Sequence, residues 1–296
     1  MLQDLTYGRL ENEFYDRKET DTDLVICIRN HQILVKRTEK FQVSYPTVAA
    51  VRNWVKTNAW DAWGESHFQY VFRMQNVNYF LWMGDGGVPV DDAYHYEDIR
   101  EFSVIETKDA CFAACTAKHL FVWYKNNRFC GACQTPTVHD HKERMLRCPT
   151  CGNMIFPRIS PAVIIAVTNG EKLLLSKYAG RAYTRYALIA GFTEIGETME
   201  ETVAREVMEE VGLKVKNIRY YKSQPWGRDG GVLMGFFCDL DGSDEIHLDE
   251  KELALAQWHD RGALPAHDDG ISLTREMIRV FEEGREPKFP MTKSCI

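Results

Sequence analysis

Two Cys-x-x-Cys pairs near the middle of the chain constrain its fold more than any other feature. Cys130 and Cys133 form the first pair, Cys148 and Cys151 form the second, and residues 134–147 separate them. Each pair can present two thiolates to one tetrahedral ion, and this spacing is typical of a zinc ribbon. We therefore expect one structural Zn²⁺, because four thiolates close its coordination shell and leave no position for a catalytic water. Zinc ribbons also bind nucleic acids or protein partners, and that alternative stays open.

The first residues of the chain and the cysteines outside the two pairs favour a protein whose cysteines stay reduced. The segment Met1–Asp4 has neither a basic leader nor an apolar core, so we expect no secretory signal and a cytoplasmic location. No stretch approaches the roughly 18 apolar residues of a membrane-spanning helix, so we expect no association with a membrane. Cys111 and Cys115 lie one turn apart in a predicted helix over residues 107–124. We expect them to be buried thiols, because free cysteine is common in protein cores.

The length and charge of the chain limit its domain number and its functions. With 296 residues, 45% of them apolar, the chain suits two globular domains with a small module between them, and not a disordered or fibrous protein. The 36 Lys and Arg residues against 43 Asp and Glu residues give a net charge of −7. This balance argues against a general nucleic-acid binder, because neutralising phosphates requires a basic surface.

After residue 158 the sequence predicts alternating strands and helices. Residues 162–167 are a β-branched strand, Asn169-Gly170 is a hairpin turn, and residues 173–175 belong to the next strand. Residues 187–190 lead into Gly191. The further expected elements are a helix over 199–211, a strand over 232–238 and a helix over 272–283.

The helix expected over 199–211 has clear end signals. Thr198 followed by Glu201 predicts a capping box at its start, and Gly212 predicts a glycine stop at its end. Apolar residues repeat every fourth position, which gives the helix one face for the core: Met199, Val203, Val207 and Val211.

The same helix gathers three carboxylates on one face. At about 100° per residue, Glu206, Glu209 and Glu210 lie within a sector about 100° wide. Glu206 and Glu210 repel each other in an isolated helix, and a divalent cation would reverse that effect. Oxygen ligands of this kind suit Mg²⁺ or Mn²⁺ shared with substrate phosphates. An acidic helix face that is merely solvated is the alternative.

The residues around this helix decide between the two interpretations. Every fixed position of the Nudix box, Gly-x5-Glu-x7-Arg-Glu-U-x-Glu-Glu-x-Gly-U with U aliphatic, is matched. The matching residues are Gly191, Glu197, Arg205-Glu206-Val207, Glu209-Glu210 and Gly212-Leu213. The chain therefore resembles the Nudix hydrolases. The resemblance implies an α/β/α sandwich whose loop–helix–loop holds Mg²⁺ or Mn²⁺ and hydrolyses nucleoside diphosphates linked to another group.

The flanking residues narrow the resemblance to one group. A Cys₄ module directly before the box, Phe156-Pro157-Arg158, and Ser223-Gln224-Pro225-Trp226 are similar to the zinc-ribbon NADH pyrophosphatases, also called NAD diphosphatases. The resemblance implies an α/β chain with an N-terminal α+β domain at 1–125, a Cys₄ zinc ribbon at 126–157 and a Nudix sandwich at 158–290. It also implies a homodimer that cleaves NAD(H) to NMN(H) and AMP, with NAD-capped RNA as a second substrate.

The resemblance also implies roles for single residues. Glu206, Glu209 and Glu210 would bind the metal, with Glu197 and Glu252 in or beside that shell. Glu209 or Glu252 would act as the base, and Arg205 would orient a glutamate. Phe192 would stack on the nicotinamide. The remaining expected substrate contacts are Gln224, Trp226 and Phe156.

One segment departs from the group and keeps other functions open. The motif continues after Trp with Pro-Phe-Pro-x-Ser, whereas this chain has Gly227-Arg228-Asp229-Gly230-Gly231. Glycines permit a mobile turn, and Arg228 could contact a phosphate. The alternative substrates are another dinucleotide, an ADP-sugar or capped RNA. A ligand-sensing nucleic-acid-binding regulator is less favoured, because the box acids are intact and the ribbon's basic residues are balanced by acids: Lys142, Arg144 and Arg147 against Asp140 and Glu143.

Overall fold

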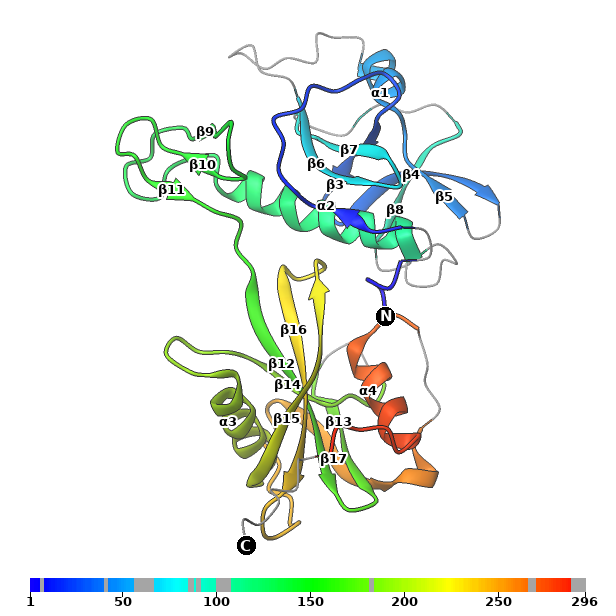
Figure 1. Cartoon of the computed structure of the whole chain (residues 1–296), viewed down its shortest axis with the longest axis vertical. Coiled ribbons are helices and arrows are strands. Elements are labelled where there is room, and N and C mark those ends of the chain that lie inside the picture. Colours follow the sequence, from blue (N-terminus) through cyan, green and yellow to red (C-terminus); the bar gives the residue numbers. More distant parts are fainter. Residues whose placement is uncertain are drawn as a thin grey trace, which may run out of the picture. The chain divides into compact units, whose positions relative to one another are not determined.

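The computed structural model divides the chain into two compact units, which are described separately (Figure 1). Unit 1 contains Met1, residues 159–226 and residues 231–296; unit 2 contains residues 2–158 and 227–230. The structure describes all residues except 6–7, 40–41, 56–66, 85–87, 89–91, 100–107, 181–183, 266–269 and 289–296. Thr107 and the predicted domain end at residue 290 therefore lie outside the described residues. The predicted domain boundaries at 125 and 157 stay predictions.

Unit 1 is built on a mixed six-stranded sheet. Its strand order is β15-β16-β12-β13-β17, and β14 pairs with β12. Strands β12 and β16 run parallel, and the other pairs are antiparallel. The strands are β12 (Ser160–Asn169), β13 (Lys172–Tyr178), β14 (Ile189–Phe192), β15 (Val215–Trp226), β16 (Gly231–Leu240) and β17 (Leu253–Asp260).

Two helices cover opposite faces of this sheet (Figure 1). Because side chains alternate along a strand, β12 sends Val163 and Ile165 toward α3 (Met199–Val211) and Ile164 toward α4 (Leu273–Glu282). A short 3₁₀ helix, η2 (Arg261–Ala263), follows β17. This arrangement confirms the expected α/β/α sandwich.

The local signals for α3 are confirmed atom by atom. The Thr198 hydroxyl accepts from Glu201 N at 3.2 Å, and Glu201 Oε2 accepts from Thr198 N at 2.7 Å. Gly212 ends the helix with a φ of 68°, where a side chain would be strained. Strand β15 had no prediction of its own. It lies at the edge of the sheet and is largely half-buried, so it lacks the apolar alternation that reveals a strand.

Unit 2 begins with two small sheets and two helices. One sheet has the order β1-β6-β7-β2, and the other contains β3, β4, β5 and β8. The elements are β1 (Leu10–Glu11), β2 (Leu24–Ile26), β3 (Ile28–Arg29), β4 (Gln32–Glu39), β5 (Gln42–Ser44), α1 (Val48–Val55), β6 (Phe68–Met74), β7 (Val77–Trp82), β8 (His95–Asp98) and α2 (Lys108–Asn126). Strands predominate, and the α+β expectation is confirmed. Helix α2 confirms the helix predicted over residues 107–124 within the described residues.

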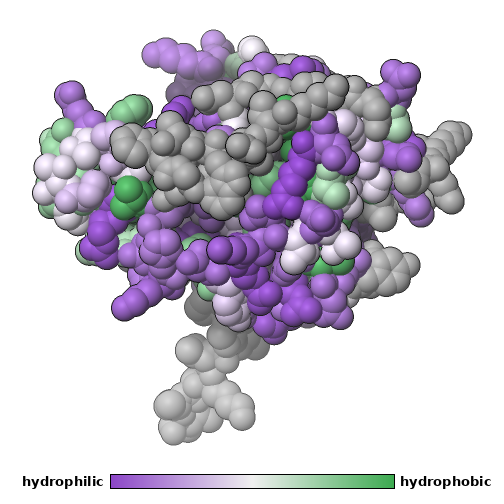
Figure 2. Space-filling view, turned by 90° about the horizontal axis from the view of Figure 1, so that it is seen from above, coloured by the Kyte–Doolittle hydropathy of each residue, from purple (hydrophilic) through white to green (hydrophobic). Residues whose placement is uncertain are grey.

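The cysteine module completes unit 2. Its three-stranded sheet has the order β11-β10-β9, from β9 (Val138–His139), β10 (Leu146–Arg147) and β11 (Met154–Ile155). In the face shown in Figure 2, most described residues are hydrophilic and the hydrophobic ones form small groups. No helix within the described part of the chain is both long enough and apolar enough to cross a bilayer.

Candidate active site and metal centres

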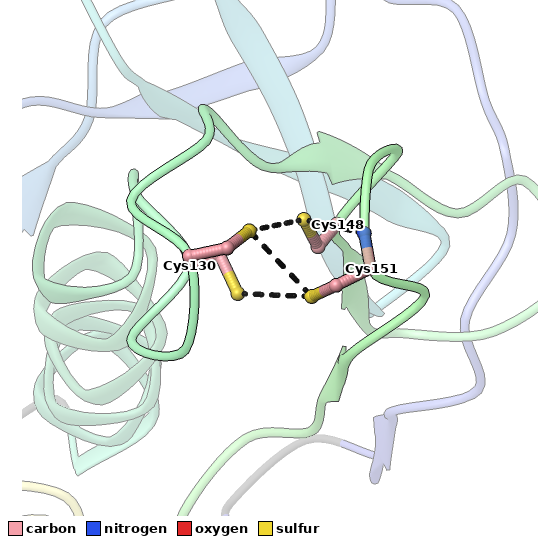
Figure 3. A group of neighbouring side chains, drawn as sticks. Cys130, Cys148 and Cys151 are labelled. Carbon is pink, nitrogen blue, oxygen red and sulfur yellow. Dashed lines mark hydrogen bonds between the residues drawn. The ribbon is translucent and has the colours of Figure 1, made fainter.

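The four predicted zinc ligands come together in unit 2. Their sulfurs all lie within 4.8 Å of one another, and Figure 3 shows three of these cysteines with their side chains converging. The Sγ–Sγ distances are 3.6 Å for Cys130–Cys151 and 3.4 Å for Cys133–Cys148. Four sulfurs at about 2.3 Å from a tetrahedral Zn²⁺ would be about 3.8 Å apart, so the residues fit this ion.

Backbone donors prepare the ribbon sulfurs for a cation. Ala132 N donates to Cys130 Sγ at 3.4 Å, and Cys151 N donates to Cys148 Sγ at 3.5 Å. The backbone N–H groups of Ala132 and Cys133 lower the pKa of Cys130 to about 6. Since zinc binds the thiolate form, this geometry favours the ligand state of Cys130. The chain carries one structural Zn²⁺ site.

In unit 1, the first turns after β14 and the middle of α3 bring the box residues together. The carboxylate of Glu206 packs against the backbone of Gly191. A Cβ atom added at Gly191 would lie 1.9 Å from Glu206 Cδ. Glu206 is 9% exposed and Glu210 is 3% exposed, whereas Glu209 faces solvent. The box glycine is therefore required because β14 and a buried carboxylate occupy adjacent space.

Arg205 connects the box glutamates. Its guanidinium donates to Glu197 Oε1 at 2.5 Å, to Glu206 Oε1 at 2.7 Å and to Glu209 Oε2 at 2.9 Å. It also donates to the Phe192 carbonyl at 3.0 Å. A cation binding Glu206 and Glu209 would therefore replace part of the charge that Arg205 supplies.

Glu197 is held on both oxygens. Besides Arg205, Glu194 N and the Thr202 hydroxyl donate to its Oε2 at 3.1 Å and 3.0 Å. Hydrogen bonding to Arg205 lowers the pKa of Glu197 to about 2. These contacts give Glu197 a part in holding Arg205, and its place among the metal ligands stays a prediction. Thr202 was not predicted from the sequence, although it is a buried residue four positions after the helix cap.

The charges around Glu206 suit a cation. Burial raises the pKa of Glu206, and the nearby carboxylates of Glu209 and Glu252 raise it further against the opposing effect of Arg205. Glu252, on the turn before β17, is thereby brought into electrostatic range of α3. Among the described residues, the four ribbon cysteines form the group whose ligand atoms all lie within 4.8 Å of one another. The carboxylate oxygens of the box glutamates are therefore farther apart than these sulfurs. Their oxygen donors fit Mg²⁺ or Mn²⁺.

The expected substrate residues fall into two kinds of environment. Phe192 is 58% exposed and Phe156 is 52% exposed, and Trp226 is half-buried at the end of β15. Gln224 is fully buried: its Nε2 donates to the Ile271 carbonyl at 2.7 Å, and its Oε1 accepts from Leu273 N at 2.8 Å. These bonds join β15 to the start of α4, and a substrate contact for Gln224 stays a prediction.

Two family models match adjacent parts of the chain. Residues 125–156 match the NADH pyrophosphatase zinc ribbon domain, and residues 158–281 match the NUDIX domain. The first segment contains all four ribbon cysteines, and the second contains the whole box together with Glu252. The models therefore cover both of the metal centres described above.

Curated relatives share these two domains. The chain is 42% identical over 167 residues to the NAD-capped RNA hydrolase NudC of Chromobacterium violaceum, covering 56% of this chain and 63% of the relative. It is 38% identical over 178 residues to the protein of that name in Pseudomonas aeruginosa, covering 59% and 64%. The chain thus matches less than two thirds of the length of these relatives.

Two solved structures align with part of the chain. A NUDIX hydrolase from Nitrosomonas europaea aligns with a TM-score of 0.45 and 23% identity, over 53% of this chain and 91% of that one. An ADP-ribose pyrophosphatase from Streptococcus suis aligns with a TM-score of 0.34 and 18% identity, over 44% and 95%.

Proposed function

We propose that this chain, which belongs to the Nudix hydrolase family and carries an NADH pyrophosphatase zinc ribbon, hydrolyses the pyrophosphate bond of NAD(H) to give NMN(H) and AMP. The observation that carries the proposal is the arrangement of Glu206, Glu209 and Glu210 on α3, with Arg205 joining two of them. The names of the curated relatives support NAD-capped RNA as a second substrate of the same chemistry.

The chain's own residues define how the reaction would proceed. Mg²⁺ or Mn²⁺, held by Glu206, Glu209 and Glu210, would supply charge neutralisation at the phosphates and an acidified water. Arg205 orients the carboxylates of Glu206 and Glu209 before the cation arrives. Glu209 or Glu252 would take the proton of the attacking water, since both are exposed and close to the buried Glu206.

Exposed rings near the carboxylates would hold the substrate. Phe192 directly follows Gly191, and its carbonyl binds Arg205, so its ring is attached to the same structure as the metal ligands. Stacking of a nicotinamide on such a ring is worth about 1–3 kcal/mol. Trp226, also in unit 1, would hold the second base. A substrate contact for Phe156, at the end of the ribbon, stays a prediction.

A second candidate is a Nudix pyrophosphatase for another dinucleotide or an ADP-sugar. The specific observation that favours it is the segment Gly227–Gly231. This segment lacks the Pro-Phe-Pro sequence of the NADH pyrophosphatases that the chain resembles. A regulator without enzymatic activity is disfavoured by the intact set of box acids. We also propose that the protein is cytoplasmic and forms a homodimer, on its resemblance to the NADH pyrophosphatases alone. Light scattering after gel filtration would test the homodimer.

A panel of substrates separates these candidates. Purified protein would be supplied with Mg²⁺ or Mn²⁺ and given NADH, NAD, ADP-ribose, Ap3A and NAD-capped RNA at equal concentrations. The proposal predicts the highest kcat/KM for NADH or NAD-capped RNA. A higher kcat/KM for ADP-ribose or Ap3A would overturn the NAD(H) assignment in favour of the second candidate.

A further inference from the structure

The turn between β15 and β16 packs against α2 within unit 2. Trp226 pairs with Gly231, so residues 227–230 form the complete turn. A Cβ at Gly227 would lie 2.3 Å from the Cys115 carbonyl oxygen, and a Cβ at Gly230 would lie 3.3 Å from His119 Nε2. Only glycine at position 227 permits this approach. The two glycines therefore serve close packing, a role that the sequence did not predict.

A polar contact fixes the turn at its centre. Lys118 Nζ, from the next turn of α2, donates to the Arg228 carbonyl at 3.1 Å. Gly230 has a φ of 75°, which directs the chain back toward β16. The backbone of the turn is thus held at its first, second and fourth residues by one face of α2.

The Arg228 side chain lies among buried thiols. Cys111 and Cys115 are each 2% exposed, and the Arg228 atoms Nε and Nη2 are also buried. The guanidinium acts on both sulfurs. Arginine keeps its proton in proteins, so this is a cation placed against two neutral or anionic sulfurs.

The two thiols respond differently to this environment. A hydrogen bond from Cys111 and the positive charges of Arg228 and Lys118 outweigh burial and lower the pKa of Cys115 to about 7. Cys27 in the same unit is also buried, and among the described residues burial alone shifts its pKa, which it raises. The contrast assigns the effect to the α2 thiol pair and its basic neighbours and not to burial.

We propose that residues 227–230 are a clamp on α2, in which Arg228 pairs with the Cys115 sulfur, and that Arg228 is a positioning residue for Trp226. Trp226 is the last residue of β15 and is bonded directly to Gly227. Fixing the turn restricts the orientations of the indole ring, which selects among dinucleotide bases. This second step rests on the proposed function, whereas the clamp itself does not.

The clamp predicts a specific kinetic pattern. Arg228→Gln and Cys115→Ala should each raise KM for NADH about fivefold to tenfold and change kcat less than about twofold, because the metal-binding carboxylates are on α3. The double variant should be no worse than either single one, since both remove the same contact. Arg228→Lys should restore most of the affinity. Cys27→Ala and Arg52→Gln are matched controls for losing a buried thiol or an arginine of unit 2.

Two readouts without catalysis test the clamp separately. Ultraviolet absorbance should detect one thiolate forming near pH 7, absent in Cys115→Ala and moved to higher pH in Arg228→Gln. Each single variant should lower Tm by about 3 °C, with no further loss in the double variant.

Additive Tm losses with an unchanged thiolate titration would overturn the clamp. Unchanged KM in both variants of an active enzyme would overturn the role in selectivity. If wild-type protein cleaves no dinucleotide, the proposed function fails while these readouts still decide on the clamp.

Discussion

The two metal centres are prepared in opposite ways. In the ribbon, two short turns bring four sulfurs within 4.8 Å of one another, and backbone N–H groups donate to the sulfurs of Cys130 and Cys148. On α3, the carboxylates are spread out and Arg205 bridges Glu206 and Glu209. The ribbon is thus a closed site in which the metal completes the fold. The α3 carboxylates are held by the internal cation Arg205, so we expect the fold to survive without metal and the site to exchange it.

Removing a ribbon ligand should have the largest effect on this comparison. Cys148→Ser should abolish zinc binding and unfold the ribbon, because a structural Zn²⁺ contributes about 10 kcal/mol or more of binding free energy to folding. Zinc content by elemental analysis and Tm would measure both effects. Cys27→Ala, which removes a buried thiol outside the ribbon, should keep one zinc per chain. A Cys148→Ser variant with full zinc content and wild-type Tm would contradict the closed site.

Changing the carboxylates should affect the rate and spare the fold. Glu209→Gln and Glu210→Gln should each lower kcat for NADH by about 10³-fold, because charge neutralisation at the phosphates depends on these oxygens. Circular dichroism and zinc content should match those of the wild type. Glu200→Gln, an exposed acid on the same helix, should leave kcat unchanged. Wild-type turnover in both test variants would remove these residues from the metal site.

The contact between Gly191 and Glu206 offers a sharper test of how the α3 site is built. Gly191→Ala would place a methyl group on the Glu206 carboxylate and should destabilise the protein by about 1–3 kcal/mol while lowering kcat. Chemical denaturation and NADH hydrolysis measure the two effects. Gly262→Ala, where nothing lies within 4 Å of the added atom, is the matched control and should be close to neutral. Equal effects of the two substitutions would rule out the proposed contact.

Acid should weaken the arginine bridge with the smallest effect of the four. The pKa of Glu197 is lowered to about 2 by Arg205, so its stabilising contribution is present above the ordinary glutamate pKa of 4.5 and is lost as pH falls toward 2. Wild-type Tm should therefore decline more steeply between about pH 4.5 and pH 3 than the Tm of Glu197→Gln. Parallel Tm profiles would show that Glu197 does not hold Arg205 in this way.

Local sequence signals predicted the four-cysteine cluster and the ends of α3, because the geometry of both depends on short spacing. The capping box at Thr198, the stop at Gly212 and the Cys-x-x-Cys turns each involve contacts within a few residues. Edge strand β15 was missed because a half-buried strand carries no apolar alternation. The burial of Gln224 depends on α4, about fifty residues away along the chain, and no local pattern encodes such a contact.

The role of the turn at 227–230 could not be predicted from local sequence either. Its glycines and arginine were interpreted as a mobile, phosphate-facing segment, because composition alone predicts conformational freedom. In the structure they pack against Cys115 and His119 of α2, over a hundred residues earlier in the chain. The departure from the family motif therefore identified residues 227–230 as unusual. Their role depends on contacts with α2, which lies far from them in the sequence.

The most direct test of the account is the identity of the products formed from NADH. Wild-type protein with bound zinc would be incubated with NADH and Mn²⁺, and the products would be identified by mass spectrometry beside a Glu209→Gln control. The account predicts equimolar NMNH and AMP from the wild type and intact NADH from the variant. Intact NADH in both samples, with no other dinucleotide cleaved, would contradict it.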